Sequence, residues 1–561
     1  MRSTFSSDAS LGESLVRSDQ ISRGSLECSI VEALEPTDPI IDHTPAEPPD
    51  MLAWDKAALY AHYACIGVVN GLLTQALMPY CLYVAHGEPN TCATIATFVN
   101  LPWGFKIIYG VLSDGVPICG AHRKPYMVIG WGLTFGCALL FALLDTIDLQ
   151  TASLLFLLMT IAYLMADCAA DAALVGISTL EPVETRGTIL STAYFIRFLF
   201  MIFAAAIMAF LYNGPATCGS FTFGLSTQQL MWVVVVMVGL FMGSTLPAFR
   251  EVAASGRKPT ISQRMGQLVE ILQQPVVWRL ILGLTSATAI SLITNQAQVN
   301  ANREWFHIEP LQLGLSQCFQ NLVLAVGVHA YKRYLLNASW RRTYACGILG
   351  MQGFNLLYLL TIYFPAFKNG WWYVFTQVDM EFAYAFTFVI GIIIVPEITE
   401  PGYEGIIYGT ITTYQNQAQN IANALNNILL AIWPTNADNQ ALATCALNSS
   451  TAPSAPLTQA CLSPPTQPPS PTEVTCPEVQ THMTYLTLLA VGLACMSLPF
   501  ILLMPQQKDH VRLLKQQPRS QTAGVLMVCL LVALVLVGTT FAVLPIFPAT
   551  KCLIIAGGTG C

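Results

Sequence analysis

Long apolar runs recur along the chain from about residue 58 to residue 546, and short polar connections separate them. A helix of about 20 apolar residues crosses roughly 30 Å of hydrocarbon, and each run is long enough for one. The pattern predicts twelve membrane-spanning helices and a thirteenth near the C-terminus. The predicted spans are 58–84, 91–113, 126–144, 152–178, 189–211, 229–247, 278–298, 311–330, 344–363, 371–395, 406–433, 484–504 and 522–546.

Composition agrees with a multi-pass, all-α membrane protein. Hydrophobic residues make up 54% of the chain and charged residues only 10%, with a mean hydropathy of +0.55. Soluble domains contain roughly 25% charged residues. The net charge of -7 comes largely from residues 1–55, an acidic stretch rich in Ser and Pro that we expect to be a disordered tail. No nucleic-acid partner is implied.

The basic residues predict the orientation in the membrane. If the N-terminus is cytosolic, all but five of the 25 Lys and Arg residues fall on cytosolic tails, loops and helix ends. Cytosolic loops of membrane proteins are enriched in these residues. We therefore expect a cytosolic N-terminus, in the plasma membrane or an endomembrane.

The same topology places residues 434–482 outside. This Pro-, Ser- and Thr-rich loop contains Cys445, Cys461 and Cys476, which either pair in an oxidising compartment or stay as free thiols. Asn448 begins a glycosylation sequon in this loop, whereas the sequon at Asn337 falls in a cytosolic loop. We expect glycosylation at Asn448 alone.

Two loops repeat at a spacing of about 218 residues. Gly110, Arg123, Lys124 and Tyr126 have counterparts in Gly327, Arg341, Arg342 and Tyr344, and the stretch 187–192 has a counterpart in 405–410. A six-span unit used twice in the same orientation is the plan of the major facilitator fold. The predicted regions are the acidic tail 1–55, a first half 56–248, a linker 249–277, a second half 278–504 and a basic loop, extra span and Gly/Cys tail over 505–561.

Charged residues inside the spans fall in a pattern that suits this fold. Spans 3, 6, 9 and 12, which are peripheral in the major facilitator fold, have no charged residue in their interiors, while spans 2, 4, 5 and 10 do. Counting along the helices puts Lys106, Asp171 and Arg197 about 12–15 Å from the cytosolic face, with Asp167 one turn deeper. We expect these four to meet at a site that binds solute or exchanges a proton. The alternatives are ion pairs that only pack the bundle and, for Lys106, a side chain that extends to the interface.

Span 11 carries a neutral polar stripe. Gln415, Asn416 and Asn420 lie in it, with further amides up to Asn427, and such groups suit an amide-rich or heteroaromatic solute. Hydrogen bonding between helices is the other explanation. In span 10, Asp379 and Glu381 are two residues apart, so at most one is expected to face the site.

The loop after span 2 combines Gly110, Asp114, Arg123 and Lys124, in which an acid at a helix end can bridge to bases and hold one gating state. The loop and span 2 resemble the folate-biopterin transporter family. The residues that carry this resemblance are Leu101, Pro102, Trp103, Lys106, Tyr109, Gly110, Ser113, Asp114, Val116, Pro117, Ile118, Gly120 and Arg123 to Tyr126, with Asp167, Asp171 and Arg197 in spans 4 and 5. The thirteenth span, the loop 434–482 and the ending 552–561 lie outside the resemblance.

The resemblance implies a secondary carrier of folates, biopterin or related pterins that works by alternating access and is driven by protons. Asp167 or Asp171 would take the proton, and Arg197 or Lys106 would bind the folate carboxylates. Two alternatives stay open: a carrier of another solute such as S-adenosylmethionine, and a receptor or sensor that does not transport. No metal-spaced His pair, Gly-x-Ser-x-Gly turn or phosphate loop occurs, so we expect neither catalytic residues nor a metal or cofactor.

Overall fold

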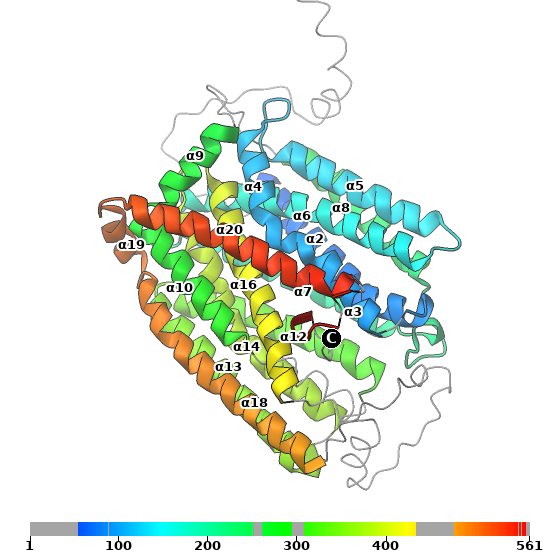
Figure 1. Cartoon of the computed structure of the whole chain (residues 1–561). Coiled ribbons are helices and arrows are strands. Elements are labelled where there is room, and N and C mark those ends of the chain that lie inside the picture. Colours follow the sequence, from blue (N-terminus) through cyan, green and yellow to red (C-terminus); the bar gives the residue numbers. More distant parts are fainter. Residues whose placement is uncertain are drawn as a thin grey trace, which may run out of the picture.

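The computed structural model describes residues 54–87, 89–249, 251, 261–293, 308–367, 369–433, 476–547, 549–550 and 552–556. It is built from helices throughout these residues (Figure 1). Asn448, Cys445, Cys461 and nearly all of the acidic tail lie outside the described residues.

Each of the six predicted spans of the first half coincides with a helix. They are α2 (Trp54–Pro79) continued by η1 (Tyr80–Val84), the broken span α3 (Pro89–Asn100), η2 (Leu101–Phe105) and α4 (Lys106–Gly115), then α5 (Lys124–Leu143), α6 (Leu149–Thr179), α7 (Thr188–Phe210) and α8 (Thr227–Thr245). We call these helices the N half. A disulfide between Cys81 and Cys92 links η1 to the start of α3.

The second half follows α9 (Ile261–Leu272) and also has helices at all six predicted positions. They are α10 (Pro275–Ser291), α12 (Pro310–Ala330) with η5 (Tyr331–Leu335), α13 (Trp340–Tyr363), α14 (Gly370–Ile393) with α15 (Val395–Ile398), α16 (Glu404–Ile432), and α18 (Cys476–Ser497) with η7 (Leu498–Leu503). We call these the C half. The short helix α19 (Lys508–Lys515) then leads to α20 (Gln521–Val543), the predicted thirteenth span.

Ten of the described helices are long and apolar enough to cross a membrane, α20 with its extension to Ile546 among them. Three predicted spans fall outside this set. The apolar part of α8 is short, α10 meets α9 at an 81° bend, and α16 carries the amide-rich stripe that lowers its apolarity. The predicted fold class, an all-α polytopic protein with the major facilitator fold, is confirmed.

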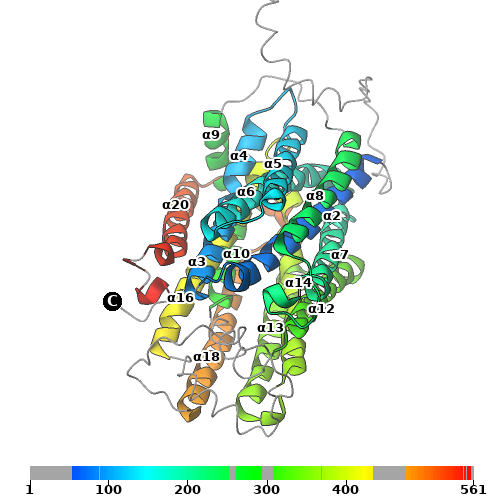
Figure 2. The same cartoon turned by 90° about the vertical axis from the view of Figure 1, so that its right-hand side faces the viewer.

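The most extensive contacts between the halves run along two helix pairs. Helix α7 packs on α12, about 120 residues further along the chain, and α4 packs on α16, about 300 residues further along, so distant segments lie side by side (Figures 1 and 2). Glycine allows the second contact: a Cβ on Gly110 would stand 2.1 Å from the Gly405 carbonyl oxygen, and one on Gly409 would stand 2.7 Å from the Lys106 carbonyl oxygen. The α4 and α16 backbones therefore touch directly.

Helix α20 lies on the outside of the bundle and crosses α16 obliquely (Figure 1). It contacts α10 and α16 of the C half, and α3 and η2 of the N half. The Tyr414 hydroxyl donates a 2.5 Å hydrogen bond to the Met527 carbonyl, and Gly538 packs against the Gln417 side chain. The extra span thus covers the seam between the two halves.

Candidate substrate and coupling site

Span 2 is interrupted halfway. Pro102 has no N–H to donate, and the chain adopts a 3-10 turn, η2, between α3 and α4. The other half of the molecule satisfies the released backbone groups. Asn416 donates to the Trp103 carbonyl at 2.7 Å and Gln417 to the Gly104 carbonyl at 2.9 Å, while the Ile107 N–H donates to Thr413 Oγ1 at 2.9 Å. The break is therefore an interface between the halves.

Directly after the break, four charged side chains form one cluster. Lys106 Nζ lies 2.7 Å from Asp167 Oδ2 and 3.4 Å from Asp171 Oδ2, and Arg197 Nη1 lies 3.0 Å from Asp167 Oδ1. Both carboxylates are fully buried, and Lys106 is 2% exposed. The structure thus brings together the four residues that were expected to meet, Asp167 with the three that depth counting placed at similar levels. Because Lys106 points at the acids, it does not extend to the interface.

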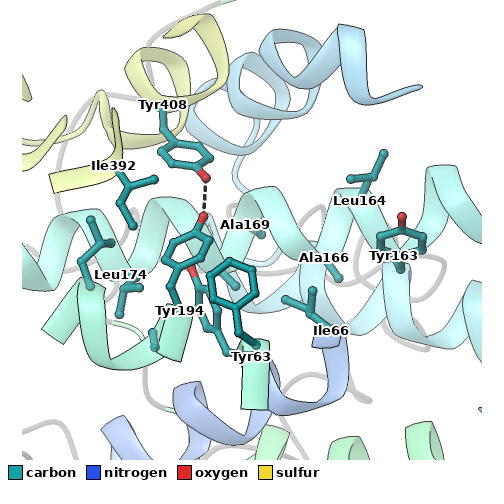
Figure 3. Close-up of a cluster of buried hydrophobic side chains, with 14 of the residues drawn as sticks. Tyr63, Ile66, Tyr163, Leu164, Ala166, Ala169, Leu174, Tyr194, Ile392 and Tyr408 are labelled. Atoms are coloured by element: carbon teal, nitrogen blue, oxygen red, sulfur yellow. Dashed lines mark hydrogen bonds between the residues drawn. The ribbon is translucent and has the colours of Figure 1, made fainter. Parts of the chain in front are cut away.

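Three tyrosines complete the surroundings of Asp171. Tyr63 on α2 and Tyr194 on α7 both donate to Asp171 Oδ1, at 2.5 and 3.0 Å. The Tyr194 oxygen also lies 2.5 Å from the hydroxyl of Tyr408 on α16 (Figure 3). Tyr408 belongs to the C half, so this contact links the two halves through the cluster.

Aromatic faces cover the bases. Lys106 Nζ lies 4.7 Å from the Trp103 ring centre and 5.5 Å from that of Tyr408, and the Arg197 guanidinium lies 5.9 Å from the Trp103 ring centre. Such positions favour a cation. The cluster holds two positive and two negative charges, so its formal charges cancel. Removing one of them, or adding one proton, unbalances the set.

The sequence interpretation missed Trp103, Tyr63, Tyr194 and Tyr408. A signal existed for two of them: Trp103 is three residues before Lys106, and Tyr194 is three residues before Arg197, which puts each near the helix face of its charged neighbour. Nothing in the sequence related Tyr63 or Tyr408 to the acids, because each lies on a separate helix.

The predicted amides of span 11 lie beside the charge cluster rather than in it. Asn416 binds the Trp103 carbonyl, and Asn420 donates to Gln417 Oε1 at 3.2 Å. Gln415 faces α14, where its Nε2 lies 3.6 Å from the Cβ position of Gly391. In span 10, Asp379 and Glu381 are both half-buried.

The predicted gating loop closes one end of the molecule, which we call the gating-loop end. Asp114 pairs with Arg123, and Arg123 Nη2 lies 2.9 Å from Glu404 Oε2 of the C half. Asp114 Oδ2 also accepts the Ile406 N–H at 2.7 Å. Burial disfavours the charged guanidinium, but Asp114 and Glu404 outweigh this and raise the pKa of Arg123.

The two remaining loop residues support this arrangement. Gly110 provides the close approach to Gly405. Lys124 is buried, and its N–H donates to Glu251 Oε2 at 2.8 Å, as does the N–H of Arg123 at the same distance. The sequence interpretation missed Glu251 and Glu404, which lie about 130 and 280 residues further along the chain.

A second set of contacts at this end joins the α6–α7 loop to the C half and to α19. Arg186 Nη1 lies 3.1 Å from Glu397 Oε2. Lys508, at the start of α19, donates to the Val183 carbonyl at 2.6 Å, and burial lowers the pKa of this ammonium group. Within the described residues, no group of three or more His, Cys, Asp or Glu is arranged to hold a metal ion.

These features define a multi-pass membrane transporter with the major facilitator fold, closed at the gating-loop end by ion pairs between its halves. A model of the BT1 family matches residues 66–467, and the chain belongs to this family. The resemblance to folate-biopterin transporters is confirmed.

The relatives agree with this assignment. "Folate transporter 1" of Plasmodium falciparum (isolate 3D7) is 22% identical over 374 residues, covering 63% of this chain and 69% of its own length. The "Folate-biopterin transporter" of Synechocystis sp. is 22% identical over 415 residues, covering 71% and 80%. "Probable folate-biopterin transporter 2" of Arabidopsis thaliana is 24% identical over 149 residues, covering 26% and 30%.

Solved structures show the same fold. The human organic anion transporter MFSD10 superimposes with a TM-score of 0.53 at 14% identity, over 81% of this chain and all of its own. The proton:xylose symporter XylE gives a TM-score of 0.54 at 11% identity, over 82% and 99%. At these identities the likeness concerns the fold alone.

Proposed function

We propose that this transporter carries folates, biopterin or related pterins by alternating access and couples their movement to protons. The observation that carries the proposal is the buried cluster of Lys106, Asp167, Asp171 and Arg197, which lies at a helix break between the two halves. Relatives named as folate and folate-biopterin transporters supply the substrate class.

The chemistry of the cluster suits an anionic solute and a proton. Arg197 and Lys106 each pair with Asp167, so a folate carboxylate can take the place of Asp167 as their partner only if that acid is neutralised or moves away. Protonation of Asp167 or Asp171 provides the neutralisation. Proton uptake and anion binding then favour each other at one site.

We further propose that the gating-loop end faces the cytosol. Most Lys and Arg residues lie in loops assigned to that side. This orientation also puts Asn448 outside, where it can be glycosylated.

The test is uptake of labelled folate and labelled biopterin by cells that lack their own carriers, with and without a proton gradient. Arg197→Ala at equal surface expression should lose uptake, because Asp167 keeps only one basic partner and the folate carboxylate loses one of its two binding groups. Arg512→Ala, in the exposed part of α19, is the matched control and should behave as the parent.

Three results would redirect the proposal. If neither solute enters cells with correctly delivered protein, competition by S-adenosylmethionine and other metabolites identifies another cargo. If both solutes bind without net flux, the chain acts as a receptor. Uptake that continues unchanged without the gradient removes the proton from the mechanism.

A further inference from the structure

We propose that Tyr408 is the positioning residue through which the C half responds to the charge state of the cluster in the N half. This rests on the proposed function only in requiring that the cluster change its charge during the cycle. The cargo does not enter the argument.

The direction of the hydrogen bonds can be read from their partners. Asp171 Oδ1 accepts from Tyr194 at 3.0 Å, so the single Tyr194 proton is already used. The Tyr194 oxygen must therefore accept the 2.5 Å hydrogen bond, and Tyr408 must donate it. The result is a chain that runs from Tyr408 through Tyr194 to the carboxylate of Asp171, and Figure 3 shows its Tyr408–Tyr194 link.

This chain exists only while the halves are closed at the gating-loop end. Tyr408 stands beside Gly409, where the α16 backbone touches the Lys106 carbonyl, and three residues from Gly405, which touches Gly110. Separation of α4 from α16 would carry Tyr408 away from Tyr194, which stays on α7 with the N half. Tyr408 is 4% exposed, so its hydroxyl has little access to water in the closed form.

Charge on Asp171 makes this chain stronger. A hydroxyl that accepts a hydrogen bond is a better donor, and a donor bound to a carboxylate is held more tightly than one bound to a neutral acid. Closure at the gating-loop end therefore favours the charged form of the cluster, and by reciprocity the charged form favours closure. Protonation of the cluster releases that end.

Several helices packed around Asp171 carry titratable or polar groups, and some of these groups are bound elsewhere. The α15 acid Glu397 pairs with Arg186 instead, and Trp131 on α5 donates to His62. Two further sets of groups surround the Asp171 carboxylate and its neighbour Asp167. Helix α6 itself supplies Tyr163 and Cys168. The other helices supply Lys106 from α4, His62 and Tyr63 from α2, Tyr194 and Arg197 from α7, and Tyr408 from α16. Among them, Tyr408 is supplied by the C half.

The test measures directly how far the halves separate at the gating-loop end. Ser113 is 1% exposed and lies against Gly405, so Ser113→Cys reports separation of the halves by its rate of reaction with a maleimide. The protein is placed in lipid nanodiscs without cargo and labelled at one pH above and one below neutrality. Tyr408→Phe keeps the ring over Lys106 and removes only the hydroxyl. Tyr414→Phe, on the same helix, removes a hydroxyl that binds Met527 instead.

In the parent and in Tyr414→Phe, we expect acid to speed labelling of Ser113→Cys relative to labelling of the exposed Glu184→Cys variant, which corrects for the pH dependence of the thiol reaction. In Tyr408→Phe, labelling at the higher pH should rise by about fivefold and the extra acid effect should disappear. Tyr194→Phe should give the same result, and the double variant should add nothing to it.

Two results would overturn the inference: Tyr408→Phe labelling like Tyr414→Phe at both pH values, or a parent whose pH response equals that of the exposed cysteine. Neither depends on folate. A failure of folate transport with a positive labelling result therefore counts against the cargo alone.

Discussion

Lys106 and Arg197 balance two acids inside the membrane, and this balance sets the cost of changing any one of the four. Breaking a buried ion pair by removing one partner costs about 3–5 kcal/mol, because the other charge is left unpaired. Replacing both partners costs less. Asp167 pairs with both bases, so the stability effects of substituting Asp167 and one of its bases together should not be additive.

We therefore expect Arg197→Met to lower the free energy of unfolding by about 3 kcal/mol, and Asp167→Asn with Arg197→Met to restore at least 1 kcal/mol of it. The double variant keeps Lys106 paired with Asp171, so its charges again cancel. Thermal unfolding in detergent measures the difference. A double variant as unstable as the sum of the two single variants would contradict the balanced cluster.

The contact between α4 and α16 depends on glycine, which makes it the most sensitive helix pair between the halves. A Cβ on Gly110 would overlap the Gly405 carbonyl, a backbone group that cannot turn aside. Gly110→Ala should therefore push α4 from α16 and weaken the Asp114 and Arg123 contacts with the C half. Gly132→Ala on α5 is the matched control, since its Cβ meets nothing within 4 Å.

The expected result is faster maleimide labelling of Ser113→Cys in Gly110→Ala, by about tenfold, and no change in Gly132→Ala. Gly132→Ala should be neutral or slightly stabilising, as Ala is the better helix former. Equal labelling of the two variants would mean that α4 and α16 do not form the closing contact.

These helices also show what the sequence could and could not predict. Hydrophobic runs gave the span positions, because length and apolarity act locally along the chain. Counting residues gave Lys106, Asp171 and Arg197 a common depth. The rotation of α2 and α16 that points Tyr63 and Tyr408 at the acids depends on packing between distant segments, so no local pattern carries it. The stripe on α16 was visible, but its use in satisfying the break at Trp103 and Gly104 required the structure.

At the scale of the whole molecule, two elements outside the repeat add to the contacts between the halves. Helix α19 reaches the N half through Lys508, and α20 covers the seam beside α16. Both continue from the end of α18, so any rocking of the halves must also move them or bend the chain between them. The extra span, which contacts both halves, must therefore accommodate that movement.

The direction of the whole molecule in the membrane gives the last prediction. Asp145, in the α5–α6 loop, and Glu184, in the α6–α7 loop, are exposed acidic residues at opposite ends of α6. In intact cells with the protein at the surface, a membrane-impermeant maleimide should label Asp145→Cys and leave Glu184→Cys unlabelled until the cells are permeabilised. The parent chain, which has exposed cysteines at Cys346, Cys495 and Cys529, supplies the background. Labelling of Glu184→Cys from outside would invert the proposed topology and place the gating-loop end outside.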